Sequence, residues 1–134
     1  MPVRRSEVLP IKSQNDVVIV RQSVRTWAAD IKMSLVDQTK IVTAASELAR
    51  NTLIYGGGGT VRIEELQEGV RVGLRLTFDD NGPGIADIEK ALKDGYTTGG
   101  GLGMGLGGSK RLSNEFTIRS EIGKGTSVII ARWK

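Results

Sequence analysis

A carboxylate and an amide are spaced for joint chemistry at Glu47 and Asn51. They stand four residues apart on a predicted helix, so both side chains point to the same side. Asn51 could offer its carbonyl oxygen to Mg²⁺, which prefers oxygen ligands and keeps waters and phosphates as its others. Glu47 could then accept a proton from an attacking hydroxyl. The pair predicts phosphate chemistry, although an exposed polar pair on a helix would read the same way.

A second candidate is the turn-rich stretch from Asp79 to Ile85, which follows a predicted strand. Its glycines, Gly82 and Gly84, let the backbone turn tightly and approach a flat ligand. The carboxylate of Asp80 could accept a hydrogen bond from an exocyclic amine such as that of adenine, and it would repel the carbonyl at the same place in guanine. An ordinary Asp-Asn-Gly-Pro turn is the alternative interpretation.

The third candidate is the run from Gly99 to Gly108, in which seven of ten residues are glycine. Its backbone N–H groups, followed by a helix that starts at Ser109, would make a phosphate cradle, with Lys110 and Arg111 supplying charge. A flexible hinge is the alternative. Further on, Thr126 ends a tight glycine-containing turn and could offer its hydroxyl to a ligand.

Two helices and a strand are expected to position the first pair. The stretch Val3–Ile11 mixes apolar and charged residues and predicts a strand. Capping boxes at Ser13 and Ser34, each with an aspartate three residues later, predict two helix starts, and the second helix runs to about Tyr55. Their predicted apolar sides are Val17, Val20, Val24, Trp27, Ala28 and Ile31 in the first, and Leu35, Ile41, Val42, Ala45, Leu48, Ala49 and Thr52 in the second.

Strands are expected at 60–67 and 70–79, joined by a short turn, and at 116–120 and 126–133 as a closing hairpin. Alternation from Val70 to Phe78 places one face of the second strand on a core. Short helices are expected at 87–93 and 107–112. Because neighbouring strands are mostly hairpin-linked, the order predicts an α+β fold: a two-layer sandwich of a mixed, mostly antiparallel sheet with helices on one face.

The composition narrows the function classes. A chain of 134 residues predicts a single domain, 1–134, and the absence of cysteine and histidine excludes thiolate sites, histidine triads and a phospho-accepting histidine. A net charge of +4 with no basic block disfavours nucleic-acid binding. With no apolar run of membrane-spanning length and no signal-peptide core, the protein is expected to be soluble and cytoplasmic, with no membrane association.

Taken in order, these motifs resemble the GHKL superfamily of ATPases and kinases, the gyrase, Hsp90, histidine-kinase and MutL group. The resemblance covers residues 34–134. Glu47-xxx-Asn51 looks like the N box, Asp80-x-Gly82-x-Gly84 the G1 box, Gly101-x-Gly103-x-Gly105 the G2 box, and Gly123-x-Gly125-Thr126 the G3 element.

The resemblance implies a Bergerat fold with a lid over about 87–102, an adenine amine on Asp80, Mg²⁺ on Asn51 and a catalytic base at Glu47. The residues expected to bind ATP are Asn51, Asp80, Gly82, Gly84, Ile85, Gly101, Gly103, Met104, Gly105, Leu106, Lys110 and Thr126.

Within the superfamily the chain is similar to the anti-sigma-factor kinases, above all to the switch-protein serine kinases of the stressosome. The runs that carry this likeness are 35–55 and 97–106. It implies phosphorylation of STAS-domain proteins, followed by release to bind and activate a PP2C-type phosphatase in a general stress sigma-factor cascade. With no histidine anywhere, a self-phosphorylating histidine kinase is excluded.

Two other functions stay open. The same motifs would serve an anti-sigma factor that sequesters a sigma factor and phosphorylates its antagonist. A pure binding module could use nucleotide only as a conformational ligand, although such a module has no need of Glu47 as a base. The oligomeric state is left open.

Overall fold

The computed structural model describes residues 3–92 and 105–134. Its strands form one five-stranded sheet in the order β1-β2-β3-β5-β4. All four neighbouring pairs are antiparallel, so the described strands include none of the parallel pairing that a mixed sheet allows. The strands are β1 (Val3–Ile11), β2 (Gly59–Glu68), β3 (Arg71–Asp80), β4 (Glu115–Glu121) and β5 (Gly125–Trp133).

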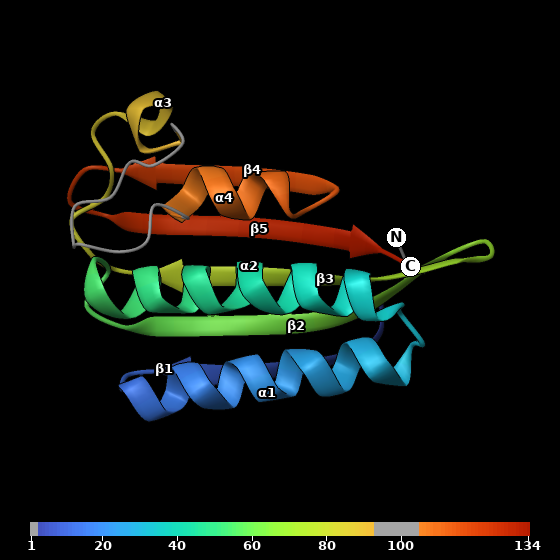
Figure 1. Cartoon of the computed structure of the whole chain (residues 1–134). Coiled ribbons are helices and arrows are strands. Elements are labelled where there is room, and N and C mark those ends of the chain that lie inside the picture. The colour runs from blue at the N-terminus through green and yellow to red at the C-terminus, as the bar shows by residue number, and fades with distance from the viewer. Residues whose placement is uncertain (1–2, 93–104) are drawn as a thin grey trace.

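Helices cover one face of this sheet, as predicted. The helices are α1 (Gln14–Asp30), α2 (Leu35–Ile54), α3 (Ile88–Ala91) and α4 (Gly105–Arg111). Figure 1 shows α1, α2 and α4 side by side in front of the strands, with α2 in the middle. None of the helices in the described ranges is long and apolar enough to cross a membrane.

Both predicted helix caps are confirmed. The Ser13 hydroxyl accepts a hydrogen bond from the Asp16 N–H at 3.2 Å, and the Ser34 hydroxyl accepts one from the Asp37 N–H at 3.1 Å. Each bond satisfies an N–H that the first helical turn leaves without a partner. The caps therefore fix where α1 and α2 begin, and with that the position of every later side chain on each helix.

The core lies between the helices and the sheet. The six residues of the predicted apolar face of α1 are all buried, and so are those of α2 except Leu35. From the sheet, Leu74, Leu76 and Phe78 of β3 alternate toward the helices. The apolar side chains that alternate along β3 and those that recur at helical spacing in α1 and α2 thus pack together in one core layer.

Two residues predicted to face the core are exposed. Leu35 is 78% exposed because it is the first residue of α2 and lies at the end of the helix. Val70 is 98% exposed because it belongs to the turn between β2 and β3, outside the pleated strand that begins at Arg71. In both elements the apolar period predicted from the sequence is correct, but the burial begins only after the first residue of the predicted repeat.

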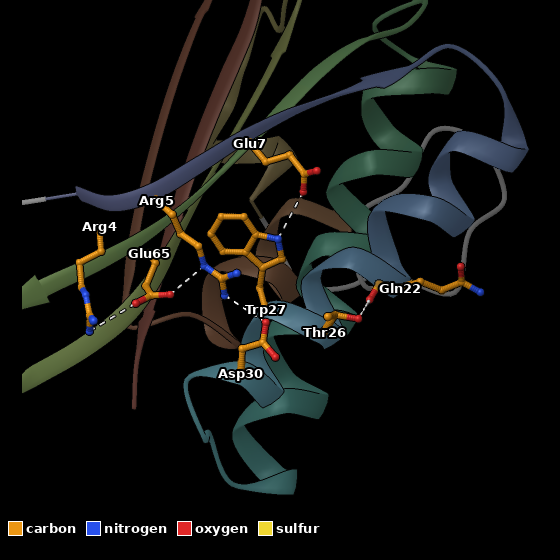
Figure 2. A network of polar contacts seen from close by, with 8 residues as sticks. All are labelled: Arg4, Arg5, Glu7, Gln22, Thr26, Trp27, Asp30 and Glu65. Atoms are coloured by element: carbon orange, nitrogen blue, oxygen red, sulfur yellow. Dashed lines mark hydrogen bonds and ion pairs between the residues drawn. The ribbon is translucent and has the colours of Figure 1, made fainter.

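A polar network holds β1 against α1 and β2 (Figure 2). The Arg5 guanidinium lies 4.0 Å from the centre of the Trp27 ring and donates to Glu65 at 2.9 Å and to Asp30 at 3.2 Å. The indole N–H of Trp27 donates to Glu7 at 3.3 Å. The cation–π contact to Trp27 and the ion pair with the largely buried Glu65 carboxylate therefore hold the edge strand β1 to α1 and β2 through side chains, in addition to its main-chain hydrogen bonds with β2.

Arg132 of β5 ties the far end of the sheet to two helices. Its guanidinium donates to the Asp37 carboxylate at 2.7 and 3.2 Å and to the Leu112 carbonyl at 2.9 Å. These hydrogen bonds from Arg132 hold the pKa of the Asp37 carboxyl below its ordinary value. The first turn of α2 and the end of α4 are therefore fastened to the same strand.

Candidate nucleotide site

Three polar side chains from three strands form one row at the end of the sheet. In the antiparallel register Asp80 of β3 lies opposite Thr126 of β5, and Thr126 lies opposite Ser120 of β4. Directly opposed residues share a face, and Asp80 follows Leu76 and Phe78 at alternate positions. The row therefore faces the helical layer.

The Asp80 carboxylate is fixed by the residues around it. Its Oδ1 accepts hydrogen bonds from the Gly82 N–H at 2.9 Å and the Thr126 N–H at 3.2 Å. Gly56, just after α2, packs so closely that a Cβ there would lie 2.6 Å from Oδ2. Among the described residues both hydrogen bonds fall on Oδ1, which leaves Oδ2 to accept from a ligand.

Ser120 connects several parts of this site, and nothing in the sequence predicts this role. Its Oγ accepts a hydrogen bond from the Ile85 N–H at 2.7 Å and lies 2.8 Å from the Thr126 hydroxyl and 3.2 Å from the Gly125 carbonyl. The loop after β3 and the turn before β5, predicted separately as ligand contacts, are thus joined through one hydroxyl. A serine in a strand carries no spacing signal, so only the register shows this role.

Glycine is required where these segments meet. Gly125 has a φ of +108°, and a Cβ at this position would overlap the Asp80 carbonyl oxygen. Gly84 has a φ of +81°, and its Cβ would overlap the Glu121 carbonyl oxygen. A Cβ at Gly82 would lie 2.7 Å from the Gly56 Cα. The predicted glycines of the G1 and G3 elements therefore let three backbone segments pack around Asp80.

Glu47 and Asn51 lie on α2, one turn apart, and both are half-buried. The main-chain carbonyl of Asn51 accepts hydrogen bonds from the Tyr55 N–H at 2.9 Å and the Gly56 N–H at 3.2 Å. Because Gly56 packs on Asp80, the last turn of α2 joins Asn51 to the row. Neither the Glu47 nor the Asn51 side chain has a hydrogen-bond partner within the described ranges, so both are available to a ligand.

The glycine-rich segment is described only from residue 105 onward. Helix α4 begins at Gly105, and Ser109, which was predicted to start the helix, lies inside it and is fully buried. The predicted helix start at Ser109 is therefore wrong, because the helix begins four residues earlier. The phosphate cradle expected in the glycine run stays a prediction. Leu106 is buried in the core and Lys110 is exposed.

Three predicted ligand residues, Gly101, Gly103 and Met104, lie outside the described residues, as does most of the predicted lid. The short helix expected over 87–93 is present as α3, Ile88–Ala91.

The donor set suits a magnesium ion carried by a nucleotide. Within residues 3–92 and 105–134 there is no group of three acidic, histidine or cysteine side chains that could hold a metal alone. Mg²⁺ takes oxygen ligands and keeps several waters beside substrate phosphates, so the amide oxygen of Asn51 could supply one protein ligand to such a shell. The residues present therefore fit the ion as a companion of bound phosphates.

Residues 36–134 match the family model described as histidine kinase-, DNA gyrase B- and HSP90-like ATPase. The serine/threonine-protein kinase RsbT of Bacillus subtilis is 44% identical over 123 residues, which cover 92% of each chain. An anti-sigma F factor from a Geobacillus strain is 33% identical over 129 residues, 90% of this chain and 86% of that one.

A solved structure shares the fold. The crystal structure of the RsbU and RsbW domains of Rv1364c from Mycobacterium tuberculosis matches all of this chain with a TM-score of 0.63 at 21% identity. The matched part is 33% of that longer chain.

The chain belongs to the family of histidine kinase-, DNA gyrase B- and HSP90-like ATPases, the GHKL superfamily that its motifs resemble. Within this family it is a protein serine/threonine kinase, in the group that the RsbT relative represents.

Proposed function

We propose that this kinase uses ATP with Mg²⁺ to phosphorylate a serine or threonine on STAS-domain proteins of a stressosome, and that once released it binds and activates a PP2C-type phosphatase. The observation that carries the proposal is the likeness to the RsbT kinase over 92% of both chains. The row of Asp80, Thr126 and Ser120, with Glu47 and Asn51 on the adjoining helix, supports a nucleotide and a hydroxyl substrate meeting here.

In this proposal the base of the nucleotide binds at Asp80. Oδ2 accepts a hydrogen bond from the exocyclic amine of adenine, because Oδ1 already accepts hydrogen bonds from the Gly82 and Thr126 N–H groups. Guanine carries a carbonyl at that position, and two acceptors facing each other cost free energy. The closely packed loop of Gly82, Gly84 and Ile85 gives the flat base a rigid wall.

The phosphates extend toward α2 and the glycine-rich segment, where Asn51 holds Mg²⁺ and Gly101, Gly103, Met104, Gly105, Leu106 and Lys110 are the proposed contacts. When bound, the ion neutralises charge on the phosphate oxygens. Asn51 orients that part of the ligand from its place one turn before the end of α2. Lys110, exposed in the last turn of α4, is the proposed source of positive charge for the phosphates.

Glu47 acts as the base in this scheme. The substrate hydroxyl oxygen forms a bond to the γ-phosphorus while the bond from that phosphorus to the bridging oxygen of ADP breaks. The hydroxyl proton passes to the Glu47 carboxylate, and ADP leaves with the electron pair. The half-exposed position of Glu47 leaves it open to a hydroxyl presented by another protein.

A direct test is incubation with ATP, Mg²⁺ and candidate STAS-domain proteins of the RsbS or RsbR kind, followed by mass spectrometry. The expected product is phosphoserine or phosphothreonine on the STAS protein. The control is the same STAS-domain protein with its phosphate-accepting serine or threonine replaced by alanine. Absence of phosphate from every candidate, with ATP binding intact, would reject the substrate assignment.

The second candidate function is an anti-sigma factor that sequesters a sigma factor and phosphorylates its antagonist. It is favoured by the likeness, at about one third identity, to anti-sigma F factors. A pull-down with purified sigma factor and purified RsbU-like phosphatase separates the two. Capture of the phosphatase alone supports the leading proposal, and capture of the sigma factor alone supports the alternative.

A further inference from the structure

Arg132 stands at a position of β5 where the alternation predicts an apolar residue. Val128 and Ile130 point toward the helices and are buried. Arg132 is the next residue on that face, opposite Leu74 of β3, and its side chain is only 11% exposed. A charge in such a place must be paired, and replacing a buried ion pair with apolar side chains often leaves stability unchanged or improved. Stability alone therefore does not explain an arginine here.

The guanidinium of Arg132 joins two helices through different nitrogen atoms. Nε and Nη2 donate to the Asp37 carboxylate at 3.2 and 2.7 Å, in the first turn of α2. Nη1 donates to the main-chain carbonyl of Leu112 at 2.9 Å, directly after α4. Because the donors of a guanidinium form a rigid planar fork, both acceptors are held in one arrangement.

Helix α4 depends on its neighbours for its position. It has seven residues, three of which are glycine, and a helix of this length and composition does not form alone in water. It packs beside α2, as Figure 1 shows, and buries Leu106 in the core. At its other end the Leu112 carbonyl is one of the acceptors that a helix leaves without an intrahelical partner, and Arg132 supplies the donor. Arg132 therefore fixes the end of α4 relative to α2.

These two helices carry groups to which the proposed function gives roles in phosphoryl transfer. Glu47 and Asn51 lie on α2, and Lys110 lies on α4. Arg132 is near the end of β5, whereas Thr126, beside the proposed base site, is near its start. A strand rises roughly 3.3 Å per residue, which places these two residues about 20 Å apart. Arg132 thus acts through the helices and not by contact with the base.

We propose that Arg132 is a positioning residue for phosphoryl transfer. By holding the start of α2 and the end of α4 on one guanidinium, it sets the proposed base and Mg²⁺ ligand on α2 against the proposed phosphate contacts on α4. The inference rests on the proposed function, which supplies those roles. A misplacement of about 1 Å between reacting groups can lower a rate by roughly a hundredfold. The rate of transfer is therefore sensitive to the position of α4, whereas the contacts of the base at Asp80 are not.

Two double variants, each of which removes one arginine–carboxylate pair, test the proposal. Arg132→Met/Asp37→Asn removes both charges of the link, so no buried charge is left unpaired and the chain is expected to fold. Arg75→Met/Glu64→Gln is the matched control, because Arg75 donates to Glu64 at 2.9 Å between β2 and β3, on the face of the sheet away from the helices. Circular dichroism and urea unfolding establish that both variants are folded.

Both variants are then measured for ATP binding by calorimetry and for transfer from saturating γ-³²P-ATP to the STAS-domain protein that the wild type labels. In Arg132→Met/Asp37→Asn the rate should fall by roughly ten- to a hundredfold. The dissociation constant of ATP should change by no more than about threefold, since a positioning residue acts on the rate more than on binding. The control should keep both quantities within about twofold of the wild type.

Amide hydrogen exchange, followed by mass spectrometry, tests the link without a protein substrate. Loss of the hydrogen bond to the Leu112 carbonyl should speed exchange over residues 105–112 by roughly tenfold or more, the effect of one hydrogen bond to a charged group. Residues 3–11 of β1 should exchange as in the wild type. Unchanged exchange over residues 105–112 in Arg132→Met/Asp37→Asn would overturn the proposal.

Transfer at the wild-type rate by Arg132→Met/Asp37→Asn, or an equal loss of rate in the control, would overturn it as well. So would a fall in ATP affinity as large as the fall in rate, because that result indicates lost binding and not lost positioning. A wild-type protein that labels no STAS-domain protein would remove the proposed function together with this inference. A wild type that labels its partner, with a variant that does so equally fast, removes the inference alone.

Discussion

Two glycines of the turn before β5 offer a matched test of how the site is built. Gly123 has a φ of +81° and Gly125 a φ of +108°, so alanine is strained at both. A Cβ on Gly123 meets nothing within 4 Å, whereas one on Gly125 overlaps the Asp80 carbonyl oxygen. The two substitutions therefore share a backbone cost and differ in the collision with β3.

The magnitudes follow from these contacts. Left-handed backbone costs an alanine roughly 1–2 kcal/mol, partly offset because alanine loses less entropy than glycine on folding, so Gly123→Ala should lose about 1 kcal/mol. Gly125→Ala must also part β5 from β3. That movement breaks the 3.2 Å bond from the Thr126 N–H to the Asp80 carboxylate. A hydrogen bond to a charged group contributes roughly 1.5–3 kcal/mol, so the total loss, with the backbone cost included, is about 2.5–4 kcal/mol.

Urea unfolding followed by circular dichroism measures both losses, and a domain of ordinary stability would keep both variants folded in buffer. Calorimetry with ATP then shows whether Gly125→Ala binds more weakly than Gly123→Ala, as a displaced Asp80 requires. Equal unfolding free energies for the two variants would refute the claim that the approach to Asp80 demands glycine.

Three further predictions concern Lys32, Asp37 and Asp80. Lys32, the residue after the C-cap of α1, has a φ of +65°, and the main-chain hydrogen bonds around it form a Schellman motif. Because glycine adopts this φ without strain, Lys32→Gly should raise the unfolding free energy by roughly 0.5–1 kcal/mol in urea titrations. Lys32→Ala, the control, should leave the unfolding free energy unchanged. Because Arg132 lowers the pKa of Asp37, the stability that this pair contributes is complete above the ordinary value of 3.8 and is lost as pH falls through the folded pKa. The stability advantage of wild type over Asp37→Asn should therefore shrink in urea titrations below about pH 4, and a constant difference would contradict the assignment. In Asp80→Asn the Gly82 and Thr126 N–H groups keep the amide oxygen at the Oδ1 position, so the amide NH2 takes the place of Oδ2 and a donor replaces the acceptor. ATP affinity should therefore fall by roughly ten- to a hundredfold in calorimetry while GTP affinity is unaffected or rises. Unchanged ATP affinity would reject the adenine assignment.

Local chemistry made much of the fold predictable. The serine caps at Ser13 and Ser34 act within one helical turn, so the sequence contains both partners of each bond. The period of two in β3 likewise depends on neighbouring residues only. The errors fall at element ends, at Leu35 and Val70, where a repeat continues in the sequence after its burial has stopped.

The parts of the site that could not be predicted depend on register. Ser120 meets Thr126 because β4 and β5 pair in one particular alignment, and Asp37 meets Arg132 across 95 residues of sequence. No short-range spacing encodes either contact. The start of α4 at Gly105 was missed for a different reason, because glycine-rich sequence has low helix propensity and the helix forms against α2 in the folded chain.

The central claim is that this chain transfers the γ-phosphate of ATP to a protein hydroxyl with Glu47 as the base. Its most direct test follows γ-³²P-ATP into a purified STAS-domain partner with the wild type and with Glu47→Gln, after calorimetry has established ATP binding for both. The account predicts a labelled partner with the wild type and a loss of two or more orders of magnitude in rate with the variant at similar ATP affinity, on the order expected for general-base catalysis. Labelling by Glu47→Gln at the wild-type rate would contradict it.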